Sequence, residues 1–165
     1  MNTGTVLYVE DEEDDVFFMR RAFGRAGLPQ TLKAVGDGQA AIDYLAGQGR
    51  FGNRLEFPLP ELVLLDLNLP MVSGFQVLKW IRSQPALRHL PVLIFSSSAR
   101  IEDLLLAKEL GADDYIEKPG SSLEFHHIAE LVQSRWLTAR PAAQLASNAA
   151  PSASAAASAR IHSSP

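Results

Sequence analysis

Four β-type runs of this chain each end in a side chain that could take part in chemistry. In chain order these side chains are Glu10 with Asp11, Asp66, Ser96 and Lys118. If the runs are parallel strands of one sheet, their carboxyl ends meet at the edge where α/β proteins bind ligands. Three carboxylates cannot stay ionised within a few ångströms of one another without a compensating cation. An oxygen-binding divalent metal and the ammonium group of Lys118 would supply that positive charge.

Magnesium fits this set of groups, because it is usually held by one or two carboxylates together with phosphate oxygens. The cluster therefore predicts phosphoryl chemistry. Asp66 is the expected acceptor, since a turn containing proline and glycine follows it and leaves its carboxylate facing a cleft. The charge of the transferred group would be met by Mg²⁺, by Lys118 and by Ser96 with nearby backbone N–H groups. The backbone carbonyl of Asn68 would complete the metal coordination.

Each of these side chains also has an ordinary structural interpretation. A carboxylate after a buried strand often caps the next helix. Glu10 and Asp11 open a run of six acids, residues 10–15, in which Asp14 and Asp15 fit the N-cap and first turn of a helix. A serine or lysine at a strand end is more often a turn residue or a surface charge. The joint pattern, in order and at strand ends, would be rare by accident.

Five β-type runs alternate with five helical ones. The strands are expected at residues 5–9, 31–35, 62–65, 92–95 and 114–118, and the helices at 14–26, 39–46, 75–83, 101–110 and 122–137. This alternation predicts a doubly wound α/β fold with a parallel sheet. A glycine-rich segment, residues 47–53, begins a long loop before the third strand.

Composition limits the class of protein. The chain has 165 residues, is 47% hydrophobic and contains no cysteine, which excludes disulfides and thiolate metal sites. No apolar run is long enough to cross a membrane and no signal segment precedes residue 5, so a cytoplasmic protein is expected. No cluster of basic residues suggests binding to nucleic acid.

The composition changes near residue 138. All 19 acidic residues precede it, and the segment 138–165 is rich in Ala, Ser and Pro. Such a segment cannot bury enough apolar surface to offset its chain entropy. We therefore expect one domain over residues 1–137 and a disordered tail over 138–165.

Four segments together resemble the receiver domain of two-component response regulators. They are Val9-Glu10-Asp11, Leu65-Asp66-Leu67-Asn68-Leu69-Pro70 with Gly74, Phe95-Ser96, and Tyr115-Ile116-Glu117-Lys118-Pro119. The resemblance covers residues 5–137 and implies a flavodoxin-like (βα)5 fold with strand order 2-1-3-4-5. It also implies that a phosphohistidine of a sensor histidine kinase phosphorylates Asp66, with Mg²⁺ on Glu10, Asp11 and Asp66.

The family further implies roles for residues around the acceptor. Ser96 and Tyr115 would be the switch pair that reports the phosphoryl group to the surface, and the peptide bond before Pro119 would be cis. Asn68 and Ser98 flank the site and are expected to tune hydrolysis of the phosphoryl group. Such a domain assists only its own phosphorylation and dephosphorylation, so an enzyme in the usual sense is not predicted.

A narrower resemblance is to the single-domain regulators that partner phytochrome-type kinases. It rests on the glycine-rich loop, the turn at residues 67–70 and the pair Trp136-Leu137. Two features depart from the family pattern. Glu10 stands where Asp is more frequent, which could change a direct metal contact into a water-mediated one, or the reverse, and Gly120-Ser121 follows the lysine and proline.

Two other functions compete with this interpretation. A phosphatase of the haloacid-dehalogenase type needs an acid two residues after its nucleophile, where this chain has Asn68. A receiver used as an unphosphorylated scaffold would not need the full set of acids, Ser96 and Lys118. A dinucleotide-binding fold would need a glycine fingerprint in place of the six acids.

We expect no output domain after the last predicted helix, and we therefore expect the signal to leave through protein contacts. Candidate partners are a downstream phosphotransfer protein and a second copy of the chain. Leu104, Leu105 and Leu106 span about 200° of a helix, more than one sheet-facing stripe can bury. We expect a homodimer face on the fourth helix, fifth strand and fifth helix, with Leu104 pointing outward.

Overall fold

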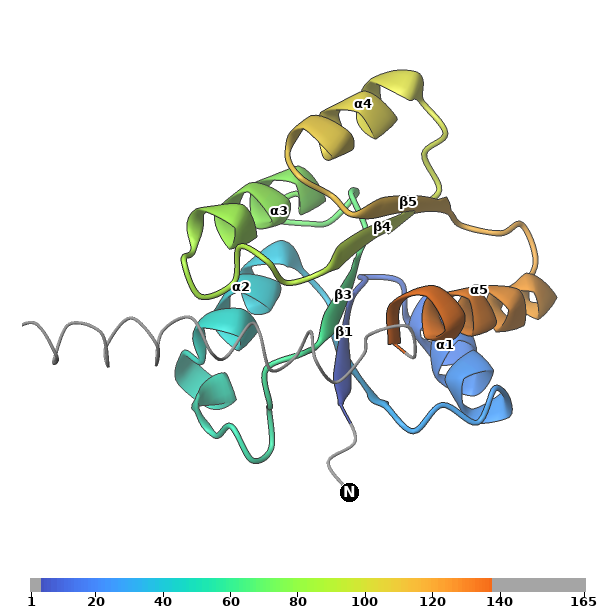
Figure 1. Ribbon diagram of the computed structural model, residues 1–165, viewed down its shortest axis with the longest axis horizontal. Helices are drawn as coiled ribbons and strands as arrows, with labels where there is room; N and C mark the ends of the chain where they lie inside the picture. Colours follow the sequence, from blue (N-terminus) through green and yellow to red (C-terminus); the bar gives the residue numbers. More distant parts are fainter. Residues whose placement is uncertain (1–3, 138–165) are drawn as a thin grey trace, which may run out of the picture. The chain divides into compact units, whose positions relative to one another are not determined.

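Three strands at the centre of the sheet are buried along their whole length. They are β1 (Thr5–Val9), β3 (Leu62–Leu65) and β4 (Val92–Ser96), as expected for parallel strands covered on both faces. β2 (Thr31–Val35) and β5 (Asp114–Glu117) form the edges. All five strands are parallel and pair in the order β2-β1-β3-β4-β5 (Figure 1), which confirms the predicted fold class.

The computed structural model describes residues 4–137. The predicted tail, residues 138–165, lies outside the described residues. The chain up to Glu130 forms one compact unit, and the residues from Leu131 belong to a second. The sheet and the site described below therefore belong to the first unit.

Within the described residues, five α-helices alternate with the strands. They are α1 (Glu13–Arg25), α2 (Gly38–Ala46), α3 (Gly74–Ser83), α4 (Ile101–Glu109) and α5 (Phe125–Val132). The predicted helix over 122–137 is divided, with a 3-10 turn η2 (Ser122–Glu124) before α5 and a π-helical stretch η3 (Gln133–Leu137) after it. No helix in this part of the chain combines the length and the apolar character needed to cross a bilayer.

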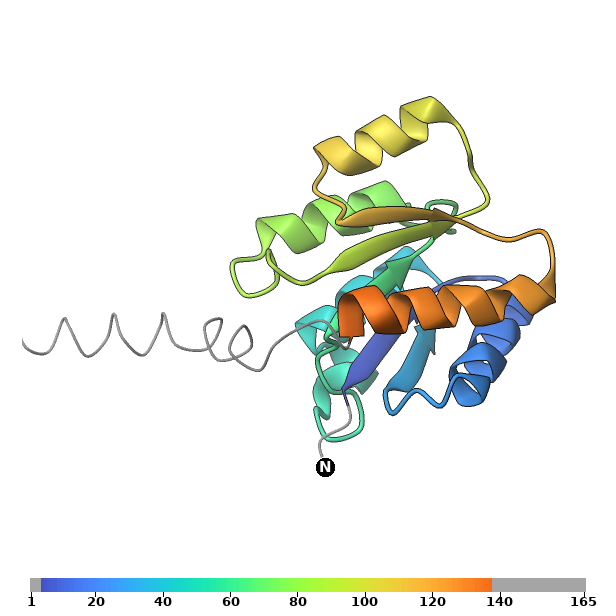
Figure 2. The ribbon, with the colours of Figure 1, turned by 45° about the vertical axis from the view of Figure 1, so that its right-hand side comes forward.

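The helices cover both faces of the sheet. Figures 1 and 2 show α1 and the start of α5 together on one face, with α2 and α3 on the other. The ring of Phe125 in α5 lies 5.7 Å, centroid to centroid, from both Phe18 of α1 and Phe95 of β4. On the other face, Leu45, Leu78 and Val63 belong to one buried cluster.

Local sequence explains where the helices begin. A carboxylate oxygen of Asp37 accepts a hydrogen bond from a backbone N–H in the first turn of α2 at 2.7 Å, and Ser73 forms a capping box with Gln76 at the start of α3. α1 has no side-chain cap and begins at Glu13, so the predicted N-cap role of Asp14 is wrong. Acids in the first turn stabilise that helix through its positive end instead.

The long loop before β3 is packed against α2. It contains the 3-10 turn η1 (Gly49–Gly52), and the rings of Phe51 and Phe57 contact each other and Tyr44 at centroid distances of 5.1–5.9 Å. The guanidinium of Arg54 donates hydrogen bonds to the carbonyls of Tyr44 and Leu45 at 2.7 and 2.9 Å. These bonds satisfy carbonyls at the C-terminal end of α2 that have no partner within the helix.

Helix α4 leaves apolar surface uncovered and Leu104 is exposed, as the sequence predicts, but Leu104 is not the single outward leucine. All three leucines are exposed, and Leu105 is the most exposed at 62%, compared with 38% for Leu104 and 39% for Leu106. Ala107 is the only buried residue of this helix. Figure 2 shows α4 beside the edge strand β5, where only a narrow stripe of the helix can be covered.

Candidate functional site

Two carboxylates meet where β1 and β3 end. Glu10 follows β1 and Asp66 follows β3, in the register that pairs Val9 with Leu65. The N–H of Asp66 donates to the carbonyl of Val9 at 3.1 Å, so the two strands stay paired up to the acids. Both side chains are buried, with 2% of Glu10 and 4% of Asp66 exposed.

The start of α3 lies directly against the backbone at Asp66. The N–H of Gly74 donates to the carbonyl of Leu67 at 3.0 Å, and a Cβ atom at Gly74 would lie 2.1 Å from the carbonyl oxygen of Asp66. Glycine permits this close approach because it has no side chain. The turn after β3 is therefore tied to a fixed position beside the acid.

Lys118, which follows β5, brings its ammonium group to both acids. Its Nζ lies 2.6 Å from Oε2 of Glu10 and 3.1 Å from Oδ2 of Asp66. The Lys118 side chain is 9% exposed, so these contacts are largely shielded from water. The backbone directs the lysine there, since its N–H donates to the carbonyl of Ser96 at 2.8 Å across the β4–β5 pair.

Asp15 is a third partner of Lys118, and sequence reasoning missed it. Its Oδ2 lies 2.9 Å from Nζ of Lys118, and its side chain is 19% exposed. In the sequence, Asp15 is one of six consecutive acids and suits the first turn of α1. Only the rotation of that helix separates it from Asp14, which is exposed, and no local signal in the sequence sets that rotation.

Three acids are close enough to share one metal ion. Among the described residues, Glu10, Asp11 and Asp66 each offer a carboxylate oxygen within 4.8 Å of the others. Glu10 and Asp66 are buried, whereas Asp11 is exposed. Carboxylate oxygens are ligands for hard divalent cations such as Mg²⁺, so these residues fit the predicted metal.

Burial and mutual charge shift the ionisation of the site. Burial raises the pKa of Glu10 to about 7, with Lys118 opposing the shift and the charge of Asp66 adding to it. Burial alone would lower the pKa of Lys118, but its contacts with Asp15, Glu10 and Asp66 outweigh that effect and raise it above the usual value. Perturbed ionisable groups gathered at a strand edge are typical of functional sites.

Tyr8 adds a buried hydroxyl to this cluster. Its OH donates to Oε2 of Glu10 at 3.3 Å. Burial, followed by the charges of Glu10, Asp15 and Asp66, raises its pKa well above the usual range. The hydroxyl therefore stays protonated and acts as a donor. Tyr8 was not among the predicted site residues, because an aromatic side chain within a buried strand is usually read as core.

The predicted switch pair consists of Ser96, at the end of β4, and Tyr115, in β5. Both residues are hydrogen-bonded to the backbone of Ser98. The buried Ser96 accepts at Oγ a hydrogen bond from the N–H of Ser98 at 3.2 Å, and the Tyr115 hydroxyl donates to the carbonyl of Ser98 at 2.7 Å. The hydroxyl of Ser98 itself donates to Asp103 at 2.5 Å, in the first turn of α4. Ser96 and Tyr115 are thus connected through one backbone segment.

Two further predictions concern the loops beside Asp66 and Lys118. Asn68 is exposed, and its N–H donates to Oδ1 of Asp66 at 3.3 Å. The predicted cis peptide bond before Pro119 is wrong for this structure, which contains no cis bond among its described residues. The trans form is intrinsically favoured by about 0.5–1 kcal/mol for bonds that precede proline.

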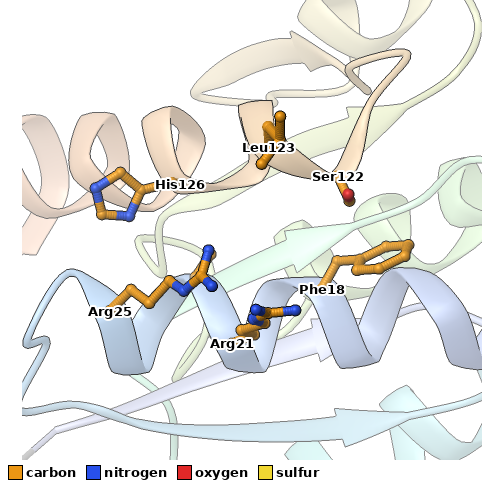
Figure 3. Close-up of a pocket in the computed structure, with 7 residues that line it drawn as sticks. Phe18, Arg21, Arg25, Ser122, Leu123 and His126 are labelled. Atoms are coloured by element: carbon orange, nitrogen blue, oxygen red, sulfur yellow. The ribbon is translucent and has the colours of Figure 1, made fainter.

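A separate pocket of about 110 Å³ lies between α1 and the segment that leads into α5 (Figure 3). Its lining consists of Phe18, Arg21, Ala22, Arg25, Ser122, Leu123 and His126. Figure 3 shows the side chains of Arg21 and Arg25 on the α1 side of the pocket, and Ser122, Leu123 and His126 on the opposite side. The lining carries two arginines and no acid, and it includes none of the predicted site residues, so this pocket is distinct from the acidic cluster.

Comparison with known proteins agrees with this geometry. Residues 6–130 match the family model for the response regulator receiver domain. The probable methanogenesis regulatory protein FilR2 of Methanothrix harundinacea is 36% identical over 135 residues, which cover 80% of this chain and 83% of FilR2. Response regulator Rcp1 of Synechocystis is 31% identical over 132 residues, which cover 80% of this chain and 88% of Rcp1.

Solved structures show the same relationship. The phosphorylated cyanobacterial phytochrome response regulator RcpA superposes with a TM-score of 0.79 at 30% identity, covering 85% of this chain and 98% of RcpA. The Mn²⁺-bound form of Rcp1 superposes with a TM-score of 0.76 at 30% identity, covering 84% and 97% of the two chains. With a matching family model, a shared fold and acids at the ends of β1 and β3, the chain belongs to the response regulator receiver domain family.

Proposed function

We propose that this chain accepts a phosphoryl group on Asp66 from a sensor histidine kinase and signals through protein contacts. One observation carries the proposal: a buried acid at the end of β3 lies 3.1 Å from a buried ammonium group, beside two further acids able to share a cation with it. This arrangement provides both a nucleophile and fixed positive charge for the group it receives.

In the proposed reaction, a carboxylate oxygen of Asp66 attacks the phosphorus of a phosphohistidine. The new P–O bond forms as the P–N bond breaks, and the imidazole leaves with the electron pair. The charge on the equatorial oxygens needs positive partners. Lys118 supplies one, and the hydroxyl of Ser96 at the end of β4 is proposed to donate to another oxygen.

Mg²⁺ is the proposed cofactor, with Glu10, Asp11, Asp66 and the backbone carbonyl of Asn68 as its protein ligands. When bound, the ion would neutralise the acids and polarise the phosphoryl group. Rcp1 has been crystallised with Mn²⁺, an ion that shares with Mg²⁺ a preference for oxygen ligands. The longer side chain of Glu10, compared with Asp, would determine whether its contact with the ion is direct or through water.

A phytochrome-type histidine kinase is the proposed donor. RcpA is described as a phytochrome response regulator, and this chain spans 98% of the RcpA chain in the superposition. We propose that the protein works in the cytoplasm and passes its signal on in one of two ways. It would either transfer the phosphoryl group to a further phosphotransfer protein or present an altered surface.

The altered surface would lie on α4 and β5. Tyr115 of β5 is hydrogen-bonded to the segment after Ser96. A shift of Ser96 toward a phosphoryl oxygen would move this segment and would therefore change the position of the Tyr115 side chain. Beside it, Ile101 and the three exposed leucines of α4 form an apolar surface. We propose that a second copy of the chain covers this surface, and that Asn68 and Ser98 tune the lifetime of the phosphoryl group.

Labelling with acetyl phosphate and Mg²⁺ tests the acceptor directly. The wild type should gain the mass of one phosphoryl group, and Asp66→Asn should gain none. Asp43→Asn is the matched control, because among the described residues the side chain of Asp43 is hydrogen-bonded only to Gln39, within α2. Comparable labelling of Asp66→Asn would refute the assignment. Transfer from an autophosphorylated phytochrome-type kinase, compared with a kinase of another class, then tests the donor.

The competing functions are not favoured. An unphosphorylated scaffold would not need Lys118 placed within 3.1 Å of both Glu10 and Asp66. A phosphatase of the haloacid-dehalogenase type would need a proton donor two residues after Asp66, and Asn68 cannot act as one. Absence of turnover with a generic phosphate monoester is the expected result.

A further inference from the structure

We propose that Asp15 restrains Lys118 and so lowers the affinity of the site for a phosphoryl group. This inference rests on the proposed role of Asp66 as phosphoacceptor. Asp15 lies in the first turn of α1, and its Oδ2 is 2.9 Å from Nζ of Lys118, with side chains only 19% and 9% exposed. In this role Asp15 is a positioning residue that acts through the lysine.

The ammonium group of Lys118 is fully occupied. It has three N–H donors, and three carboxylates surround it at 2.6 Å (Glu10), 2.9 Å (Asp15) and 3.1 Å (Asp66). The oxygens of a phosphoryl group on Asp66 would lie beyond the present carboxylate, separated from it by the new P–O bond. Lys118 must shift to reach them, and its remaining contacts oppose that shift.

A bound metal would relieve only part of this restraint. Glu10 and Asp66 belong to the three acids that can share a cation, so an ion there would compete with Lys118 for their charge. Asp15 is not in that set and would keep the lysine as its partner.

Asp14 provides a matched control for this role. It lies in the same helical turn and carries the same charge, but it is exposed, and its side chain makes no hydrogen bond or ion pair among the residues that the structure describes. Neutralising Asp14 therefore changes the net charge equally without releasing Lys118. Because Asp14 is surrounded by water, its field at the site is strongly screened.

The test is the affinity for beryllofluoride in Mg²⁺, measured by calorimetry, with the rate of phosphoryl loss as a second readout. Asp15→Asn should bind beryllofluoride about threefold to thirtyfold more tightly than wild type, which lies within the range of couplings measured for residues in contact. The affinity of Asp14→Asn for beryllofluoride should stay within about twofold of the wild-type value, because Asp14 does not contact Lys118. Asp15→Glu keeps the charge and should restore most of the wild-type affinity.

A double-mutant cycle shows whether Asp15 acts through the lysine. In a Lys118→Ala background, adding Asp15→Asn should no longer tighten binding. If the gain persists there, or if Asp15→Asn binds no more tightly than Asp14→Asn, the proposal is wrong while the acceptor function stands. A wild type that binds no beryllofluoride would overturn the acceptor function and this proposal together.

Discussion

The hydroxyl of Tyr8 donates a hydrogen bond to Oε2 of Glu10, and the same oxygen lies 2.6 Å from the ammonium group of Lys118. Glu10 is therefore anchored on two sides within a buried site. Because burial raises its pKa from 4.5 to about 7, the folded protein holds a proton on this residue more tightly than the unfolded chain does. The stabilisation that follows is complete below pH 4.5 and is lost as the pH rises through about 7.

The first prediction is a pH dependence of stability that Glu10→Gln removes. Between pH 5 and 7.5, without metal, the free energy of unfolding of the wild type should fall relative to the variant. One proton contributes a slope of at most about 1.4 kcal/mol per pH unit. Urea unfolding at several pH values measures the difference. Glu12→Gln, at an exposed position, should follow the wild type, and parallel curves for all three proteins would contradict the role of Glu10.

The second prediction is that Mg²⁺ stabilises the domain through Asp11. At ten times the dissociation constant, the ion should raise the free energy of unfolding by about 1.4 kcal/mol. Asp11→Ala should remove most of this gain without harming the fold, because Asp11 is exposed. Thermal melting with and without Mg²⁺ measures the effect, with Asp14→Ala as control. An equal response in wild type and Asp11→Ala would place the ion elsewhere.

The third prediction concerns the contact between α3 and the backbone at Asp66, which follows β3. Gly74→Ala should destabilise the domain by about 1–3 kcal/mol, the usual cost of overpacking, because its Cβ would lie 2.1 Å from the carbonyl oxygen of Asp66. Gly36→Ala is the control, since a Cβ there meets nothing within 4 Å. Chemical denaturation of both variants should separate them, and equal stability would show that the turn adjusts freely.

The fourth prediction tests the proposed dimer. With beryllofluoride and Mg²⁺ at high micromolar protein, light scattering should give the mass of a dimer for wild type and of a monomer for Leu105→Glu. Leu123→Glu alters another exposed leucine, 77% exposed on η2, and should behave as wild type. A monomeric wild type under every condition would refute the dimer.

The sequence was enough to predict that the acids and the lysine lie together, because this prediction depends only on where the strands end and on their being parallel. Unbroken apolar runs such as Leu62–Leu65 indicate buried parallel strands, and parallel strands place the residues after them at one edge. Glu10, Asp66 and Lys118 then meet whatever the details of the intervening loops. The paired contacts at 2.6 and 3.1 Å agree with that expectation.

Features that depend on a helix's rotation or on long-range backbone contacts were not predictable. Asp15 rather than Asp14 contacts Lys118, and Leu105 rather than Leu104 is the most exposed of the three leucines of α4. In each case a one-residue step turns the side chain by about 100°. Arg54 donates to carbonyls of α2 nine and ten residues earlier. The residues next to Arg54 in the sequence do not indicate which carbonyls accept these hydrogen bonds.

The bond between Lys118 and Asp15 joins residues 103 positions apart, which has a consequence for biosynthesis. A nascent chain that has left the ribosome only as far as β4 contains the acceptor and all its neighbouring acids, but not the ammonium group that compensates them. Their mutual repulsion would then disfavour closure of the strand ends. If Asp66 is the phosphoacceptor as proposed, competence to accept a phosphoryl group would thus arise only when the last strand is in place.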